Sequence, residues 1–241
     1  MTHRDFRSLA ANMWAQRAQA ELGAQARFRL LIEQLEDHGA HAKVTDLAKR
    51  AFVEEEDHAH LCAQIARDLG HSSGFAEVDE SETSLQPQPS WRERESEADR
   101  LLCEVTLMCC ITETINASLM NTIYAGAKDT PAKKIVHRIL RDEVKHGQMG
   151  WGYLTSESQR RDCSLLSRYL GEMLEISVKD ELFAPIPFEI QDAELVNFGV
   201  LPVSMRMDQF AETLTQVVIP GFEHFNVDSQ GAKDWYRAKV S

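Results

Sequence analysis

Two Glu-x-x-His motifs are the feature of this sequence with the clearest chemical potential. The first joins Glu55 to His58, and the second joins Glu143 to His146. Residues three apart share one face of a helix, so the carboxylate and the imidazole of each motif can reach the same metal ion. In a chain of this composition one such motif is expected about once by chance. The argument for a metal site therefore depends on where the motifs stand relative to other residues.

Each motif has a single glutamate at its own level on a neighbouring helix. The midpoint between Glu21 and the histidine of the first motif falls beside Gly39. The midpoint between Glu113 and the glutamate of the second motif falls beside a turn at 129–131. Antiparallel helices joined by a short turn place residues equidistant from that turn at the same height. The sequence therefore predicts that Glu21 faces the first motif and Glu113 faces the second.

Four long helices are expected to carry these residues. Apolar residues recur at helical spacing, and turn residues divide the segments. Thr45 is the expected cap of the second helix, and Ser90 with Glu93 forms a capping box before the third. Thr130 and Pro131 cap and open the fourth. The predicted helices span 6–37, 45–69, 91–125 and 131–153.

All six residues fall on the apolar stripes of these helices. A carboxylate in the core of a bundle costs several kcal/mol unless it is paired or bound to a cation. Four carboxylates and two imidazoles match the charge and coordination of two divalent ions, and this donor set suits iron or manganese better than zinc alone. The candidate metal ligands are Glu21, Glu55, His58, Glu113, Glu143 and His146.

Other polar residues have simpler interpretations. Glu33 is out of register with the first motif, and Glu104 is expected on the solvent face of the third helix. Cys109 could line a pocket but is better explained as a small core residue. Trp14 and Tyr153 could relay electrons, although core packing is the simpler role. His137 lies off the inner stripe of the fourth helix, and His224, in the C-terminal part, is not taken as a ligand. Four histidines are expected at the surface: His38, His41, His60 and His71.

The whole chain of 241 residues is expected to form one domain, 1–241. Within it, 6–155 is the four-helix unit, and 156–241 adds helices that cover it. A polar segment at 71–90 indicates a long crossover loop. Beyond the bundle, helices are expected at 161–182, at 204–218 with Ser204 as its cap and Pro220 ending it, and at 231–239. Residues 183–202 are expected to be irregular.

The composition narrows the classes of function. The net charge is −12, and no basic stripe is present, so nucleic acid is not an expected partner. Five cysteines without a CxxC pair suit a reducing compartment. No apolar leader precedes Phe6, and no run of about 18 apolar residues occurs, so we expect no membrane span and a cytoplasmic location.

The order Glu, Glu-x-x-His, Glu, Glu-x-x-His on four helices resembles the ferritin-like di-iron carboxylate superfamily over about residues 6–155. The resemblance implies an all-α, antiparallel four-helix bundle with a long crossover and added C-terminal helices. It also implies two iron ions, with a manganese–iron pair as the alternative. The expected partners are O₂, a small-molecule substrate and an external electron donor, and a homodimer is compatible with this class.

The resemblance implies an oxygenase or oxidase, with a non-catalytic iron-binding protein or ferroxidase as the alternative. Rubrerythrins carry paired CxxC motifs, which this chain lacks. N-oxygenases usually add a histidine one turn before the fourth-helix glutamate, where Ile139 stands here. About 85 residues follow the fourth helix and favour an enzyme with a covered substrate pocket. A helical bundle that never binds metal is the third reading. The residues expected to shape the pocket are Phe183, Ile186, Phe188 and Phe210.

Overall fold

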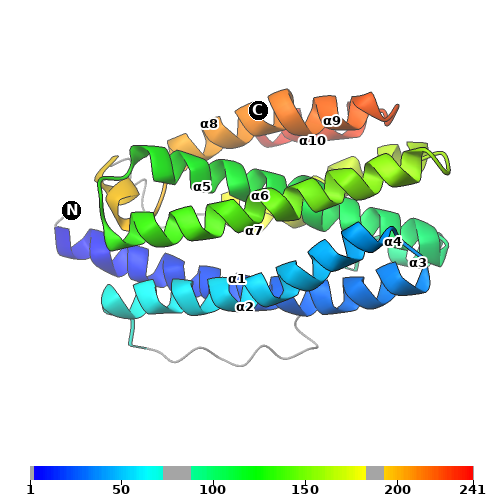
Figure 1. The fold of residues 1–241 in the computed structure, drawn as a ribbon. Helices are drawn as coiled ribbons and strands as arrows, with labels where there is room; N and C mark the ends of the chain where they lie inside the picture. The colour runs from blue at the N-terminus through cyan, green and yellow to red at the C-terminus, as the bar shows by residue number, and fades with distance from the viewer. Residues whose placement is uncertain (1–2, 73–87, 183–192, 241) are drawn as a thin grey trace.

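The computed structural model describes residues 3–72, 88–182 and 193–240, and within these ranges the chain is helical and forms no strand. Four long helical rods lie alongside one another (Figure 1). The all-α fold predicted from the sequence is therefore confirmed. The rods are α1 (His3–Asp37), α2 (Ala42–Asp68), the third rod made of α4 (Glu97–Val105), a π-helical segment (Thr106–Glu113) and α5 (Thr114–Gly126), and α6 (Pro131–Ser158).

Short turns make the paired rods antiparallel. Gly39 adopts φ +62° between α1 and α2, a conformation that suits glycine at the end of a helix. At the start of α6, the Thr130 hydroxyl accepts a hydrogen bond from the Lys133 amide, as the sequence predicts. Helix α2 contacts both α1 and α6, so the two pairs close around a common interior. The predicted apolar stripes of the helices face this interior.

Two caps predicted for the four-helix unit are wrong. His41, not Thr45, caps α2, and its ring accepts a hydrogen bond from the Lys43 amide. Ser90 caps nothing, because its amide and hydroxyl both donate to the Glu172 carboxylate.

The third rod accordingly starts later than predicted. The first turn, α3 (Trp91–Arg94), ends at Glu95, whose backbone is extended. Ser96 then caps α4 by accepting a hydrogen bond from the Asp99 amide. Because Glu172 binds the predicted cap Ser90, the rod begins at Ser96 instead.

The C-terminal helices pack on the side of the bundle that carries α5 and the π-helical segment (Figure 1). Helix α8 contacts α5, and α7 contacts the π-helical segment and α10. The predicted loop at 71–90 and the irregular region at 183–202 lie partly outside the described residues. The segments are a 3₁₀ turn (Ser164–Arg168), α7 (Leu170–Leu182), a 3₁₀ turn (Ala193–Phe198), α8 (Val203–Thr213), a π-helical segment (Leu214–Val218), α9 (Ile219–His224) and α10 (Gln230–Val240).

Pro220 does not end its helix, contrary to the prediction. The π-helical segment widens the rod just before Pro220, so the proline falls in the first turn of α9, where a missing amide is tolerated. The helix continues to His224, and Asn226 then turns the chain at φ +58°. The cap of α8 is Pro202 rather than the predicted Ser204.

One helix, Glu97–Gly126, is long and apolar enough by length and composition to cross a membrane. In this fold 78% of its most apolar window is buried inside the protein. A helix at the centre of a bundle is likewise long, apolar and mostly buried. The criterion of about 18 consecutive apolar residues misses this helix because threonine, glutamate and asparagine interrupt its sequence.

Candidate metal centre

The four rods bring all six predicted residues to the middle of the bundle. Glu21 comes from α1, the first motif from α2, Glu113 from the end of the π-helical segment, and the second motif from α6. Each is buried, with exposed fractions from 0% for Glu55 and His58 to 7% for Glu21. The register predicted from the turns therefore places these side chains correctly.

The six side chains form two overlapping groups that could each hold a cation. Within each group, one ligand atom from every residue lies within 4.8 Å of the others. Glu55 and Glu143 belong to both groups, so they lie between the two candidate positions. The first group adds Glu21 and His58, and the second adds Glu113 and His146. The protein thus contains a cluster of buried carboxylates and imidazoles able to bind metal.

Both imidazoles present Nδ1 to the shared carboxylates. Nδ1 of His58 lies 3.4 Å from Oε2 of Glu55 and 3.7 Å from Oε1 of Glu143. Nδ1 of His146 lies 3.0 Å from Oε1 of Glu55 and 3.4 Å from Oε2 of Glu143. The two ring centroids are 5.9 Å apart. Each shared glutamate therefore touches both halves of the cluster.

These close contacts are not good hydrogen bonds. Within the described part of the chain, neither oxygen of Glu55, neither ring nitrogen of His58, nor Nδ1 of His146 has a hydrogen-bond partner, although all are buried. Oε2 of Glu143 is unpartnered as well. Leaving a buried polar atom unsatisfied costs about 1–3 kcal/mol, and more for a charged group. A cation at each position would satisfy these lone pairs, so the residues fit a pair of metal ions.

Without metal, protons balance the charge of the cluster. Burial, reinforced by the charges of Glu55 and Glu143, raises the pKa of Glu21 well above its ordinary value. Burial and the neighbouring Glu143 raise the pKa of Glu113 in the same way. Both shifts favour the neutral, protonated form of the acid. Burial also raises the pKa of Glu55, but His146 and His58 outweigh it and lower that pKa to about 2.

The imidazoles show the complementary effect. Burial lowers their pKa, but the surrounding carboxylates outweigh burial and raise the pKa of both His58 and His146. Both shifts favour the protonated ring, which offsets the negative charge of the neighbouring carboxylates. A divalent ion binding here must displace protons, which couples metal affinity to pH.

Two outer carboxylates complete the cluster, and the sequence analysis missed both. Nε2 of His146 donates to Oε2 of Glu54 at 3.0 Å. Oδ2 of Asp142 lies 3.6 Å from Nε2 of His58. Each acid directly precedes the glutamate of one motif and serves the histidine of the other motif. The sequence does contain a sign of them, because another acidic residue stands directly before each Glu-x-x-His motif.

A close contact between the third rod and α6 positions Glu113. A Cβ added at Gly150 would lie 2.5 Å from Cβ of Cys109 and 2.8 Å from the Cys110 amide nitrogen, which leaves room only for glycine. The π-helical segment ends at Glu113, and its wider turn changes the helical phase there. The regular 3.6-residue pattern assumed from the sequence does not contain this feature.

The other polar residues are not part of either group. Cys62 and Cys109 are fully buried near the cluster, and burial raises the pKa of both thiols well above the ordinary value. Trp14 and Tyr153 are core residues, and the Trp14 indole donates to the Phe198 carbonyl. Glu104 is only 9% exposed, so its predicted solvent-facing position is wrong. The short helix α3 covers that face of α4.

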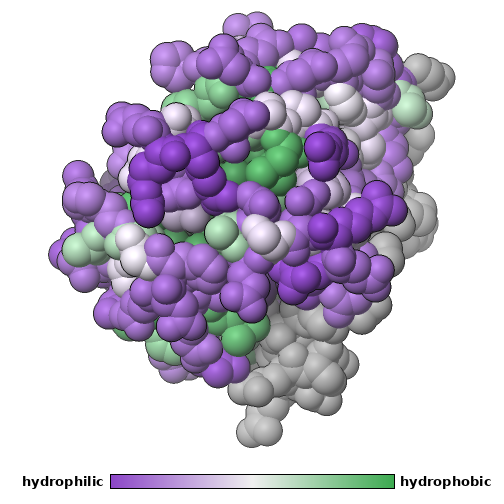
Figure 2. Space-filling model, turned by 90° about the vertical axis from the view of Figure 1, so that its right-hand side faces the viewer, coloured by the Kyte–Doolittle hydropathy of each residue, from purple (hydrophilic) through white to green (hydrophobic). Residues whose placement is uncertain are grey.

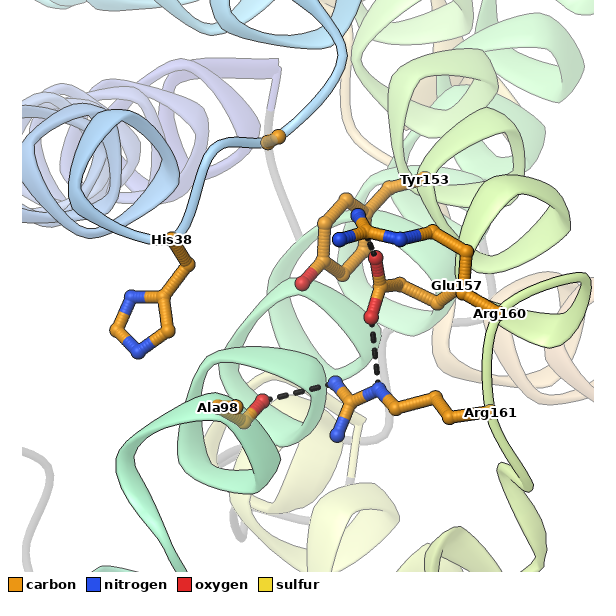
Figure 3. Close-up of a pocket in the computed structure, with 7 residues that line it drawn as sticks. His38, Ala98, Tyr153, Glu157, Arg160 and Arg161 are labelled. Atoms are coloured by element: carbon orange, nitrogen blue, oxygen red, sulfur yellow. Dashed lines mark hydrogen bonds and ion pairs between the residues drawn. The ribbon is translucent and has the colours of Figure 1, made fainter.

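A pocket of about 220 Å³ opens at the end of the bundle that carries the α1–α2 turn (Figure 3). Hydrophobic residues show at the centre of this end, surrounded by hydrophilic ones (Figure 2). Tyr153, two turns beyond His146 on α6, faces the pocket. None of the six candidate ligands lines it; the lining residues are His38, Ala40, Ala98, Tyr153, Glu157, Arg160 and Arg161.

Of the four residues predicted to shape a substrate pocket, Phe210 belongs to the described part of the chain. Phe210 is fully buried and packs edge-on against Trp235 and Tyr236 of α10. Phe183, Ile186 and Phe188 lie outside the described residues. The role of this region in shaping a substrate site therefore stays a prediction.

Comparisons of the chain with protein-family models, with curated proteins and with solved structures found no match. What can be said of function therefore rests on the buried Glu/His cluster and the helical fold that positions it.

Proposed function

We propose that this protein is a non-haem di-iron oxidoreductase that uses O₂ to oxidise a small organic substrate. The observation that carries the proposal is the pair of overlapping Glu/His groups, in which six buried oxygen and nitrogen atoms of Glu55, His58, Glu143 and His146 lack hydrogen-bond partners in the described structure. Oxygen and nitrogen donors of this kind suit iron, with manganese as an alternative in one position. The resemblance to ferritin-like di-iron proteins supports the same assignment.

Each residue has a defined part in this proposal. Glu55 and Glu143 would hold both ions, Glu21 and His58 would complete one site, and Glu113 and His146 would complete the other. When bound, a ferrous pair would supply electrons for the reduction of O₂. The protons held by Glu21 and Glu113 would leave as the metals bind. An external donor would restore the ferrous state, since the sequence has no dinucleotide-binding motif.

The proposal is tested by anaerobic loading with ferrous iron followed by exposure to air. We expect the native protein to consume O₂, and the Glu113→Ala variant to lose this rapid phase. Glu104→Ala is the matched control, because it removes a buried glutamate from the same rod outside the cluster. O₂ consumption that is equally fast in all three proteins would contradict the proposal.

The alternative is a ferroxidase that handles iron without an organic product. Size-exclusion chromatography and iron uptake separate the two. A large assembly that accumulates many irons per chain would favour the ferroxidase. A small oligomer that stops at about two irons per chain, and that turns over further O₂ only when reductant and an organic substrate are present, would favour the oxidoreductase.

A further inference from the structure

Lys145 lies between the two outer carboxylates. It stands on α6, directly before His146, and its side chain is 44% exposed. Its Nζ lies 2.6 Å from Oδ1 of Asp142 and 3.5 Å from Oε1 of Glu54. The second oxygen of each acid faces an imidazole: Glu54 accepts from His146, and Asp142 lies beside His58. One ammonium group therefore contacts both acids behind the two histidines.

The two acids need a cation to share this space. They extend from neighbouring helices toward the same region, and two carboxylates at short range repel each other. Arg138 also approaches Asp142, at 3.6 Å, but its shorter contact, 2.9 Å, is with Asp57. Lys145 is the cation among the described residues that contacts both outer acids.

We propose that Lys145 is a positioning residue that holds both outer carboxylates, and through them fixes the ring orientation of both histidines in the cluster. Glu54 accepts a hydrogen bond from His146 and Asp142 lies 3.6 Å from His58, whereas Lys145 contacts both acids. Because a metal-binding imidazole is oriented by the partner of its other nitrogen, the loss of Lys145 must weaken both metal positions together. This inference rests on the proposed metal pair.

The test compares Lys145→Met with a matched control, Lys49→Met. Lys49 also forms a 2.6 Å ion pair, with Glu36, but both partners are about half exposed and lie outside the cluster. Metal-free proteins are titrated with cobalt(II), and the two binding events are followed by absorbance. We expect Lys145→Met to weaken both events by about 10- to 100-fold, and Lys49→Met to weaken neither.

Variants of the acids complete the design. Glu54→Gln should weaken one binding event, Asp142→Asn the other, and Lys145→Arg should keep most of the native affinity. If Lys145→Met binds both cobalt ions as tightly as Lys49→Met does, the inference is overturned. Weakening of only one event would also overturn it, because Lys145 would then serve a single acid.

A second readout separates this inference from the proposed function. Nitrogen-15 NMR of the metal-free protein reports which ring nitrogen of each histidine is protonated and hydrogen-bonded. We expect Lys145→Met to change the signals of both His58 and His146, and Lys49→Met to change neither. If the native protein binds no cobalt, the proposed function fails, and the NMR comparison still decides whether Lys145 orients both rings.

Discussion

Buried carboxylates occur in two different settings in this protein. At the end of the bundle, Glu157 accepts hydrogen bonds from Arg160 and Arg161 at 3.1 and 2.7 Å. In the middle of the bundle, Glu55 is more deeply buried, and neither of its oxygens has a hydrogen-bond partner in the described structure. The first carboxylate is satisfied by the protein itself. The second has no such donor among the described residues.

Glu104 makes the same point on the rod that carries Glu113. It accepts from the Trp91 indole at 3.2 Å and from the Arg92 guanidinium at 2.8 Å. Glu113 is similarly buried, but the charge next to it is another carboxylate, Glu143. Burial of an acid is therefore poor evidence for a metal site. Burial without a matching donor, in a group that includes imidazoles, is the informative combination.

Metal binding should produce the largest difference in thermal stability between variants of the two kinds of buried carboxylate. Ligands that bind only the folded state stabilise it by about 4 kcal/mol per site at 1,000 times Kd. Two sites should therefore raise the melting temperature by roughly 10 °C or more, at about 2–4 °C per kcal/mol. Differential scanning fluorimetry with ferrous iron or with chelator measures this shift. Glu104→Ala should melt lower in both conditions yet keep the shift, and Glu113→Ala should lose most of it.

The pH dependence of folding stability should be the next largest effect, because folding raises the pKa of several buried groups. Folding raises the pKa of Glu21 and Glu113 above the ordinary 4.5 and that of His58 and His146 above 6.5. The folded metal-free protein therefore holds more protons than the unfolded chain, and its stability falls as pH rises. Urea unfolding at about pH 6 and about pH 9 checks this.

The loaded protein should show a smaller fall, because its ligands have already lost their protons, whereas buried thiols such as Cys62 and Cys109 still hold theirs. On the acid side the sign reverses for Glu55, whose lowered pKa contributes stability above 4.5 that is lost as pH falls toward about 2. A metal-free protein that is equally stable at about pH 6 and about pH 9 would contradict the proton balance inferred for the cluster.

Gly150→Ala should disturb the cluster through the backbone. The added methyl group collides with Cys109, and overpacking of this kind costs about 1–3 kcal/mol. It should also displace the segment that carries Glu113 and weaken metal binding. Gly152→Ala is the control, since a Cβ there meets nothing within 4 Å and should stabilise α6 by about 0.5–1 kcal/mol. Equal unfolding free energies for the two variants would refute the close contact.

Methionine in place of Glu113 or Glu104, the two buried glutamates of the third rod, gives the smallest and most discriminating pair of effects. Glu113→Met should stabilise the metal-free protein by about 1 kcal/mol, because it removes a buried carboxyl group whose neighbour is another carboxylate, Glu143. Glu104→Met should destabilise it by about 1–3 kcal/mol, because it leaves the donors of Trp91 and Arg92 unpaired. Chemical denaturation in the presence of chelator measures both. Changes of the same sign would remove the distinction between the two settings.

The sequence was sufficient for the cluster because two independent regularities agree there. Apolar spacing fixes which face of a helix points inward, and the short turns fix the height of each residue. Both apply to Glu21 and Glu113, which were placed by counting from the turns at Gly39 and 129–131. The outer acids Glu54 and Asp142 were missed because their roles depend on side chains crossing from one motif to the other.

Features that depend on tertiary packing could not be predicted from the same patterns. Ser90 has the sequence of a cap, but Glu172 on a distant helix binds it instead. Glu104 lies on the outer face of its helix, but Trp91 folds back over that face. The π-helical segments before Glu113 and Pro220 alter the helical phase without a distinctive local sequence.

The central claim is that the unpartnered carboxylates and imidazoles form a site for two metal ions. The most direct measurement is the metal content per chain after anaerobic reconstitution with ferrous iron and removal of the excess. We predict about two irons per chain in the native protein and in Glu104→Ala, and a clear loss in Glu113→Ala. Absence of bound metal in the native protein, at any ferrous concentration that leaves it folded, would contradict the account.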